Sequence, residues 1–170
     1  FTGVYFFLKK HKMIYRLRLI LDTKEDVLRD IEIQSINSFE DLHYAIISAF
    51  GFEGNEMASF YLSDSEWNQG EEITFESFGQ QKVMKDNILE IIINENQKNF
   101  IYVYDFLNLW TFFVELIETS EENKSTNYPE TIFSVGKMPD KAPERLFIEN
   151  KNDKFEEEEG FEEEDPYQFY

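Results

Sequence analysis

The chain has 170 residues, of which 42% are hydrophobic and 17% aromatic, so it has enough apolar side chains for one folded domain with a core. Its 35 acidic residues outnumber 16 lysines and arginines, and the formal net charge of −19 would repel nucleic acid over most of the surface. The absence of cysteine excludes disulfides, thiolate metal sites and cysteine nucleophiles, and is compatible with the reducing cytoplasm, where we expect the protein.

Residues 1–12, FTGVYFFLKKHK, place apolar residues before basic ones. A secretory signal has the reverse order, so this segment is not predicted to be one. Met13 stands directly before a regular strand pattern. We therefore expect residues 1–12 to be upstream read-through outside the fold, and Met13 to be the natural start.

The first predicted strand is MIYRLRLIL, residues 13–21. Its residues alternate between an apolar face that includes Leu17 and Leu19 and a second face with two arginines, as in a half-buried strand. A shorter alternation at 29–36 follows a charged connection. The two segments predict a hairpin or meander.

Residues 38–50 repeat apolar side chains at helical spacing, which predicts the main helix. Ser38 and Asp41 occupy the two positions of a capping box at its start. Gly51 is predicted to end it, because glycine adopts the left-handed conformation that closes many helices.

The segment 57–64 predicts a strand, and the polar stretch after it contains a brief extended EITF sequence at 72–75. DNILEIIIN, residues 86–94, fits two structures. An aspartate cap and apolar residues at helical spacing suit a short helix, whereas three consecutive isoleucines suit a strand. We favour the short helix.

The most apolar stretch, 100–118, contains Asp105, Asn108 and Glu115 in its interior. A charge in the middle of a membrane helix costs about 2.5–3.5 kcal/mol, so this stretch is not predicted to span a membrane. Its aromatic and β-branched residues alternate instead, which predicts antiparallel strands at about 99–105 and 110–118, joined by a turn. After a polar loop, a short extended segment is predicted at 131–136.

Because strands and helices are mixed rather than regularly alternating, the predicted class is α+β. We expect residues 13–148 to form a mixed, mainly antiparallel sheet packed against one main helix and a short second helix. An acidic disordered tail is expected at 149–170. The expected core contains Leu17, Leu19, Leu42, Ile46, Phe60, Val103, Trp110 and Val114.

An ordered set of segments over about residues 13–140 resembles the plasmid pRiA4b ORF-3-like family. The residues that carry the resemblance are Leu42-His43, Ala49-Phe50-Gly51-Phe52, Phe60, Tyr102-Tyr104-Asp105-Phe106, Trp110, Tyr128-Pro129 and Gly136. The resemblance implies an α+β fold. It implies no settled activity, although family members are common on plasmids and mobile elements and are sometimes labelled resolvase-like.

The chain is a divergent example of that pattern. Leu107 and Asn108 stand where the family usually has Gly-Asp before the tryptophan, and the usual Pro-Pro-Glu-Asp-Cys-Gly-Gly segment is missing. Any role tied to that segment is therefore not implied for this chain.

The resolvase label fits the residues poorly. Such an enzyme needs a nucleophilic Ser or Tyr among arginines that neutralise the scissile phosphate. The chain has only four arginines: Arg16 and Arg18 share one predicted strand, and Arg29 and Arg145 are isolated. We expect Arg16 and Arg18 to form a solvated strand face, and we expect no recombinase activity.

His43 is the only histidine of the predicted fold. Glu40 and His43 have the i, i+3 spacing that can bring two ligands to one metal, but no third ligand is identifiable. We therefore expect His43 to bond a neighbouring strand or loop, and we expect no metal or cofactor.

The remaining candidates lie in or beside the aromatic hairpin. Asp105 is either a general acid or base or, as we expect, the residue that opens the turn. Tyr102 and Tyr104 belong either to the core or to one aromatic wall of a groove, and Trp110 is expected in the core. The candidate groove or partner contacts are thus His43, Tyr102, Tyr104, Asp105 and Trp110.

Residues 149–170 contain ten acidic residues and two lysines, and this repulsion disfavours independent folding. The segment is either a solubilising tail, or a docking segment whose carboxylates steer towards a basic partner while its rings make the contact. A third alternative is that it folds back on Arg16 and Arg18. The rings in question are Phe155, Phe161, Tyr167, Phe169 and Tyr170.

The sequence contains no glycine-rich phosphate loop, nucleophile elbow, metalloprotease helix or calcium loop. We therefore expect a non-enzymatic binding or protein-interaction module, with another protein as partner through the acidic tail and with oligomeric state open. The alternative is a mobile-element protein that acts near nucleic acid.

Overall fold

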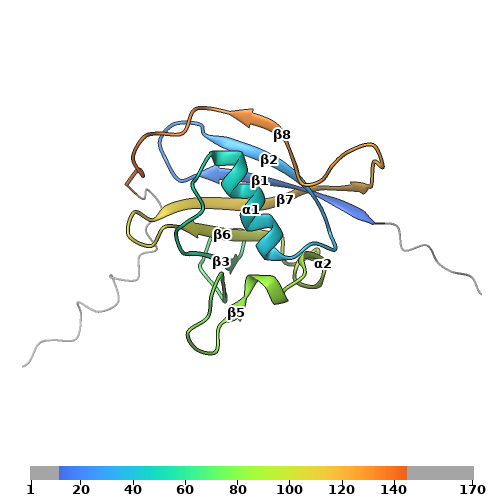
Figure 1. The fold of residues 1–170 in the computed structure, drawn as a ribbon, viewed down its shortest axis with the longest axis horizontal. Coiled ribbons are helices and arrows are strands. Elements are labelled where there is room, and N and C mark those ends of the chain that lie inside the picture. Colours follow the sequence, from blue (N-terminus) through green and yellow to red (C-terminus); the bar gives the residue numbers. More distant parts are fainter. Residues whose placement is uncertain (1–11, 145–170) are drawn as a thin grey trace, which may run out of the picture.

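The computed structural model describes residues 12–144. Residues 1–11 of the expected upstream segment and the acidic tail lie outside the described residues, whereas Lys12 is described and its carbonyl accepts a hydrogen bond from the Glu122 amide at 3.2 Å. Within residues 12–144 the chain forms one eight-stranded sheet in the order β5-β4-β3-β6-β7-β1-β2-β8, and α1 lies across one of its faces (Figure 1). The strands are β1 (Met13–Leu21), β2 (Leu28–Gln34), β3 (Ala58–Ser63), β4 (Glu72–Thr74), β5 (Lys82–Val83), β6 (Asn99–Tyr104), β7 (Trp110–Glu121) and β8 (Glu130–Val135); the helical elements are α1 (Phe39–Phe50), η1 (Met84–Asp86) and α2 (Leu89–Ile92).

The expected α+β class is confirmed. Every paired neighbour in the sheet runs antiparallel except β4 and β5, which are parallel. The sheet therefore is mixed and mainly antiparallel, with α1 as the main helix and α2 as the short second helix. The short β5 was not expected, because two residues are too few to show an alternating pattern.

The ends of α1 are formed as the sequence predicts. The Ser38 hydroxyl accepts a hydrogen bond from the Asp41 amide at 3.1 Å, and the Asp41 carboxylate accepts one from the Ser38 amide at 2.9 Å, which completes the capping box. Gly51 follows the helix at φ 75°, a left-handed conformation that favours glycine.

The core lies between α1 and the face of the sheet that α1 covers. In the β1–β2 register, Leu17 lies opposite Ile31 and Leu19 lies opposite Arg29. Leu17, Leu19 and Ile31 are buried in one cluster with residues of α1. Phe39 of α1 contributes edge-to-face ring contacts to that cluster. Its partners are Phe60 at 5.1 Å and Phe100 at 5.5 Å between ring centroids.

One residue of the expected core differs from the expectation. Val103 is buried as expected, on the face of β6 opposite to Tyr102 and Tyr104. Trp110 is only partly buried, because it begins β7 at the edge of the cluster.

The expectation that Arg16 and Arg18 form a solvated strand face is met only in part, because their side chains are 28% and 33% exposed and both bind a buried carboxylate. Asp30 stands opposite Arg18 in the β1–β2 register and is fully buried. Arg18 donates Nε and Nη2 to the two carboxylate oxygens, both at 2.8 Å, and Arg16 donates Nε at 3.0 Å and Nη2 at 2.6 Å. Burial alone would raise the pKa of Asp30, but these hydrogen bonds outweigh it and hold the pKa below its usual value.

The apolar stretch 100–118 forms β6 and most of β7, as expected. None of the helices within residues 12–144 has the length and apolar character that crossing a membrane requires.

A stability comparison tests the core assignment. Leu42 of α1 is buried, and Ile91 of α2 is 75% exposed. We expect Leu42→Ala to lower the free energy of unfolding by about 2–5 kcal/mol, because it leaves a cavity in the core, and Ile91→Ala to change it by less than about 0.5 kcal/mol. Chemical denaturation measures both, and equally small losses would contradict the assignment.

Candidate functional site

His43 and Tyr102 form a buried pair between α1 and β6. Their side chains are 1% and 0% exposed, and His43 Nδ1 lies 2.8 Å from the Tyr102 hydroxyl, within hydrogen-bond distance. Burial lowers the pKa of His43 to about 4 and raises the pKa of Tyr102 well above its ordinary value. Both groups are thus neutral at neutral pH and out of contact with solvent, so they hold the helix on the sheet rather than present a reactive group.

Tyr104 is also buried, and it connects the hairpin to the segment that follows α1. Phe52 stacks on the Tyr104 ring at 4.3 Å and meets the Trp110 ring edge-on at 5.4 Å. The Tyr104 hydroxyl accepts a hydrogen bond from the Gly54 amide at 3.0 Å. Of the two alternatives for Tyr102 and Tyr104, the structure therefore places both in the interior rather than on a groove wall.

Asp105 opens the β6–β7 turn and organises it. Its carboxylate accepts hydrogen bonds from the Leu107 amide at 3.0 Å, the Asn108 amide at 3.3 Å and the Asn108 side chain at 2.6 Å. Its backbone carbonyl accepts from the Leu109 amide at 2.6 Å. Burial would raise the pKa of Asp105, but these hydrogen bonds lower it, so the carboxylate is ionised and committed to the turn.

The same turn exposes three large apolar side chains. Leu107 is 92% exposed and Phe106 44% exposed, and Leu109 is also exposed. Asp105 and Leu109 both adopt positive φ angles, 62° and 55°, which few residues do outside tightly determined turns. We call residues 105–109 the leucine turn.

A second segment reaches the same end of the sheet. After β8, Gly136 adopts φ 75°, and a Cβ at this position would collide with the Asp26 carbonyl oxygen, so only glycine permits the close approach to the β1–β2 loop. Arg29 reinforces this region, because its Nη1 donates to the Val135 carbonyl at 2.8 Å. Met138 then packs against the core. We call residues 137–144 the exit arch.

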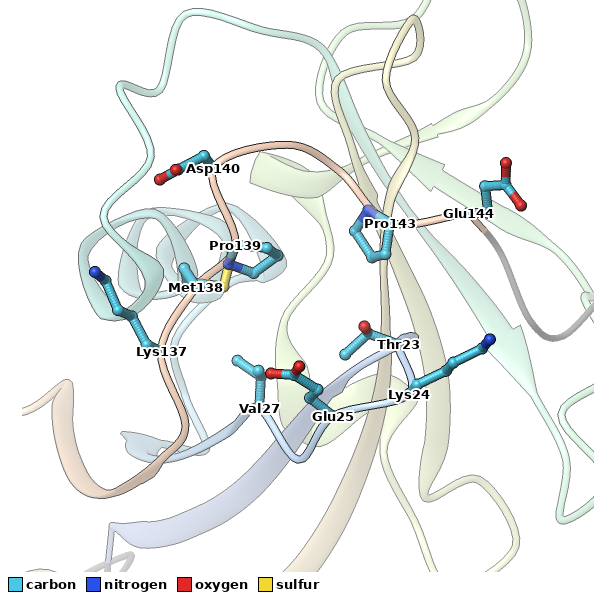
Figure 2. A pocket seen from close by; sticks show the side chains of 10 residues that line it. All are labelled: Thr23, Lys24, Glu25, Val27, Lys137, Met138, Pro139, Asp140, Pro143 and Glu144. Atoms are coloured by element: carbon cyan, nitrogen blue, oxygen red, sulfur yellow. The ribbon is translucent and has the colours of Figure 1, made fainter.

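The exit arch borders two adjoining cavities that are open to solvent. Figure 2 shows the first, where the arch passes above the β1–β2 loop and the Pro143 ring points down toward Thr23. This cavity has a volume of about 660 Å³. The second, of about 680 Å³, lies between the arch and the leucine turn and is lined by Leu107, Asn108, Leu109, Trp110 and residues 140–144. Asp140, Pro143 and Glu144 line both.

The leucine turn and the exit arch together form the candidate site, at the end of the sheet opposite α2 (Figure 1). Of the five residues that the sequence singled out, Asp105 and Trp110 belong to this end, whereas His43, Tyr102 and Tyr104 lie buried behind it. The sequence analysis did not identify Leu107 or the arch. One signal was present, since Leu107 and Asn108 depart from the family pattern.

No cofactor or metal is assigned to this site. Among residues 12–144, no three side chains of the His, Cys, Asp and Glu types come together in a way that could hold a metal ion. The candidate docking rings Phe155, Phe161, Tyr167, Phe169 and Tyr170 lie outside the described residues.

Comparisons with known proteins add a family and a fold. A family model described as "Plasmid pRiA4b ORF-3-like protein" matches residues 13–144. The crystal structure of a protein of unknown function, MM3350 from Methanosarcina mazei Go1, is similar at 21% sequence identity with a TM-score of 0.65, over 73% of this chain and 70% of that chain. At this identity the likeness shows the fold alone. No curated protein sequence matches the chain.

The buried His43 predicts how stability depends on pH. Its folded pKa of about 4 lies below the ordinary value of 6.5, so its contribution is fully present above about pH 6.5 and is lost as the pH falls toward 4. We expect the free energy of unfolding to fall by roughly 3 kcal/mol over this pH range because of His43, in addition to the loss that the carboxylates cause. In His43→Gln this additional fall should be absent when the free energy of unfolding, measured by denaturation, is plotted against pH. The same dependence on pH in the wild type and in His43→Gln would contradict the burial of a neutral His43.

Proposed function

Since the chain belongs to the plasmid pRiA4b ORF-3-like family, whose description states no reaction, we propose a role from its own surface. The role is that of a non-enzymatic protein-interaction module. Its contact surface is the leucine turn, residues 105–109, with the adjoining exit arch.

The exposure of Leu107 on a fixed turn is the observation that carries this proposal. A leucine that is 92% exposed is costly to hydrate, and it gains free energy when a partner covers it. Because Asp105 already fixes the backbone through four hydrogen bonds, little further ordering is needed when a partner binds. Leu107 therefore has the properties of a preorganised anchor, with Phe106 and Leu109 as its apolar surroundings.

The titratable groups near the site support a binding role over catalysis. The Asp105 carboxylate is occupied by the turn, and His43 is buried with Nδ1 against Tyr102. A general acid or base must reach the reacting group of a substrate. Neither of these two residues meets that condition.

The charge of the domain favours a basic partner. Residues 12–144 contain 25 acidic and 11 basic residues, and a surface of one predominant sign accelerates association with a surface of the other. The partner that fits is a protein with a positively charged surface around an apolar pocket that accepts Leu107. The acidic residues of 149–170 would extend the same attraction.

The arginine contacts weigh against the alternative of a protein that acts near nucleic acid. Arg16 and Arg18 are both committed to Asp30. Arg29 donates to the backbone carbonyls of Leu28 and Val135. A phosphate backbone would therefore have to compete with existing partners for all three guanidinium groups.

Affinity capture with two matched variants tests the proposal. Leu107→Asp places a charge on the proposed contact, and Ile91→Asp places the same charge on α2, where Ile91 is 75% exposed. We expect the wild type and Ile91→Asp to recover the same basic protein from an extract of the source cells. Recovery by Leu107→Asp should fall at least about tenfold, equivalent to 1.4 kcal/mol of binding free energy. Both variants should keep the wild-type melting temperature.

Equal recovery by the two variants would refute the leucine turn as the contact surface. Retention of the wild type on heparin at low salt, lost as salt rises, would favour the nucleic-acid alternative instead. Clean passage through heparin agrees with the proposal.

A further inference from the structure

Strand β8 forms one open edge of the sheet. The strand order ends with β5 on one side and β8 on the other, and β8 (Glu130–Val135) has six residues where β5 (Lys82–Val83) has two. Among residues 12–144, β8 pairs with β2 alone, and Figure 1 shows its other side at the border of the sheet. An edge strand presents backbone N–H and C=O groups to which a further strand can be added. The sequence of β8 contains neither the proline nor the lysine that often prevents such an addition.

The hydrogen bonds at the two ends of β2 show which residues of this segment face β1. At one end, the Leu21 amide donates to the Val27 carbonyl at 2.9 Å. At the other end, the Ser35 amide donates to the Met13 carbonyl at 2.8 Å. Because the residues of an antiparallel strand alternate between its two sides, the odd-numbered residues of β2 are bonded to β1. The even-numbered residues direct their backbone groups to β8.

This alternation identifies Ser134 as a residue of β8 that faces outward. In the β2–β8 register, Leu28 lies opposite Val135. Asp30 lies opposite Phe133. Val135 and Phe133 therefore direct their N–H and C=O groups toward β2, whereas the backbone groups of Ser134, which stands between them, point to the open side. The Ser134 N–H is thus available to an added strand.

A cavity beside the start of β8 is lined by acidic and aromatic side chains. It lies between α1 and β8, is open to solvent and has a volume of about 270 Å³. Asp41 and Tyr44 line it from α1, Glu130 lines it from β8, and none of the described residues around it is basic. Tyr44 is 49% exposed, so a ligand can reach it from solvent.

The two carboxylates of this cavity can bind a cation. Asp41 Oδ2 accepts two hydrogen bonds from Ser38, at 2.9 Å from the amide and 3.1 Å from the hydroxyl, whereas Oδ1 accepts none within residues 12–144. In the same part of the chain, Glu130 takes part in no ion pair. An arginine or lysine side chain in the cavity would meet both carboxylates and the ring of Tyr44, whose face attracts cations.

We infer that a short extended segment of a partner protein adds to β8 as a further strand and places an arginine or lysine side chain in this cavity. Backbone hydrogen bonds to the open edge bind the segment, and the cavity selects the basic side chain. Ile132 and Phe133, 37% and 44% exposed, offer apolar contacts to the other side chains of the segment. The register with β2 shifts at Ile132, and this bulge limits the added pairing to a few residues. The surface is separate from the leucine turn, so the inference goes beyond the proposed function.

Charge distinguishes this occupant from a second copy of the chain. Residues 12–144 contain 25 acidic and 11 basic residues. Two copies joined at β8 would therefore repel each other, whereas a basic segment is attracted. A basic segment of another protein thus fits the edge and its cavity better than a second β8 does.

Selection from short random peptides displayed on phage tests the inference with the full chain. We expect the wild type to enrich peptides with an arginine or lysine between β-branched residues, which favour extended structure. Ser134→Pro removes the outward N–H and leaves the bonds to β2 in place, whereas Ser134→Ala keeps this N–H. Enrichment of the basic motif should be at least about tenfold lower on Ser134→Pro than on Ser134→Ala. Absence of the motif on the wild type, or equal enrichment on the two variants, would overturn the inference.

The affinity of a selected peptide, measured by fluorescence anisotropy, tests the cavity without a change in the backbone. Glu130→Lys should weaken binding at least about tenfold. The matched control Glu66→Lys makes the same change of net charge at an exposed position between β3 and β4, and it should alter the affinity by less than about twofold. Both variants should keep the wild-type melting temperature. Equal losses of affinity would show that net charge alone attracts the peptide, and would refute the cavity as its site.

Two further measurements separate this site from the other surfaces. Leu107→Asp should leave the affinity for the peptide unchanged, so that failure of the leucine turn and failure of the β8 site are seen separately. In sedimentation experiments, a concentration-dependent dimer that Ser134→Pro abolishes would show that a second copy occupies the edge, and would overturn the inferred occupant. A monomer, or a dimer that Ser134→Pro leaves intact, agrees with the inference.

Discussion

The fold depends on how α1 is fixed to the central strand β6. Phe39 packs at the start of the helix against Phe100, and His43 meets the Tyr102 hydroxyl in the middle. Just beyond the helix end, Phe52 stacks on Tyr104. Alternate residues of β6 thus receive successive turns of the helix, so the register of the sheet and the position of the helix determine each other.

This anchoring is also what makes the surface at one end of the sheet well defined. The strand that holds α1 continues directly into Asp105, whose amide is bonded to the Met57 carbonyl at 2.8 Å. His43, Tyr104 and Gly136 are among the residues through which the chain resembles its family. Each makes a structural contact: His43 with Tyr102, Tyr104 with the Gly54 amide, and Gly136 with the β1–β2 loop. Residues that match the family pattern, Asp105 among them, therefore build the scaffold, whereas Leu107 and Asn108 of the leucine turn stand at positions where this chain departs from the pattern.

Local signals made much of the fold predictable. The alternation in β1, the capping box of Ser38 and the turn residues of the aromatic hairpin each act within a few residues, so the sequence displays them. The pairing of Asp30 with two arginines was not predictable, because it depends on the register between β1 and β2. The exit arch was not predictable for the same reason, since it depends on the close approach of Gly136, after β8, to Asp26 in the β1–β2 loop. Burial of Tyr102 and Tyr104 could not be separated from a groove wall before the position of α1 was known.

The central claim is that the leucine turn is rigid before any partner binds, and amide hydrogen exchange of Leu107, Asn108 and Leu109 measures this most directly. Each of these amides is bonded to Asp105, so the account predicts exchange at least about tenfold slower than in an unstructured peptide. In Asp105→Ala, exchange of Leu107 and Asn108 should accelerate toward the unprotected rate. Unprotected exchange at these amides in the wild type would contradict the account, because Leu107 would then be carried by a flexible loop rather than held ready for contact.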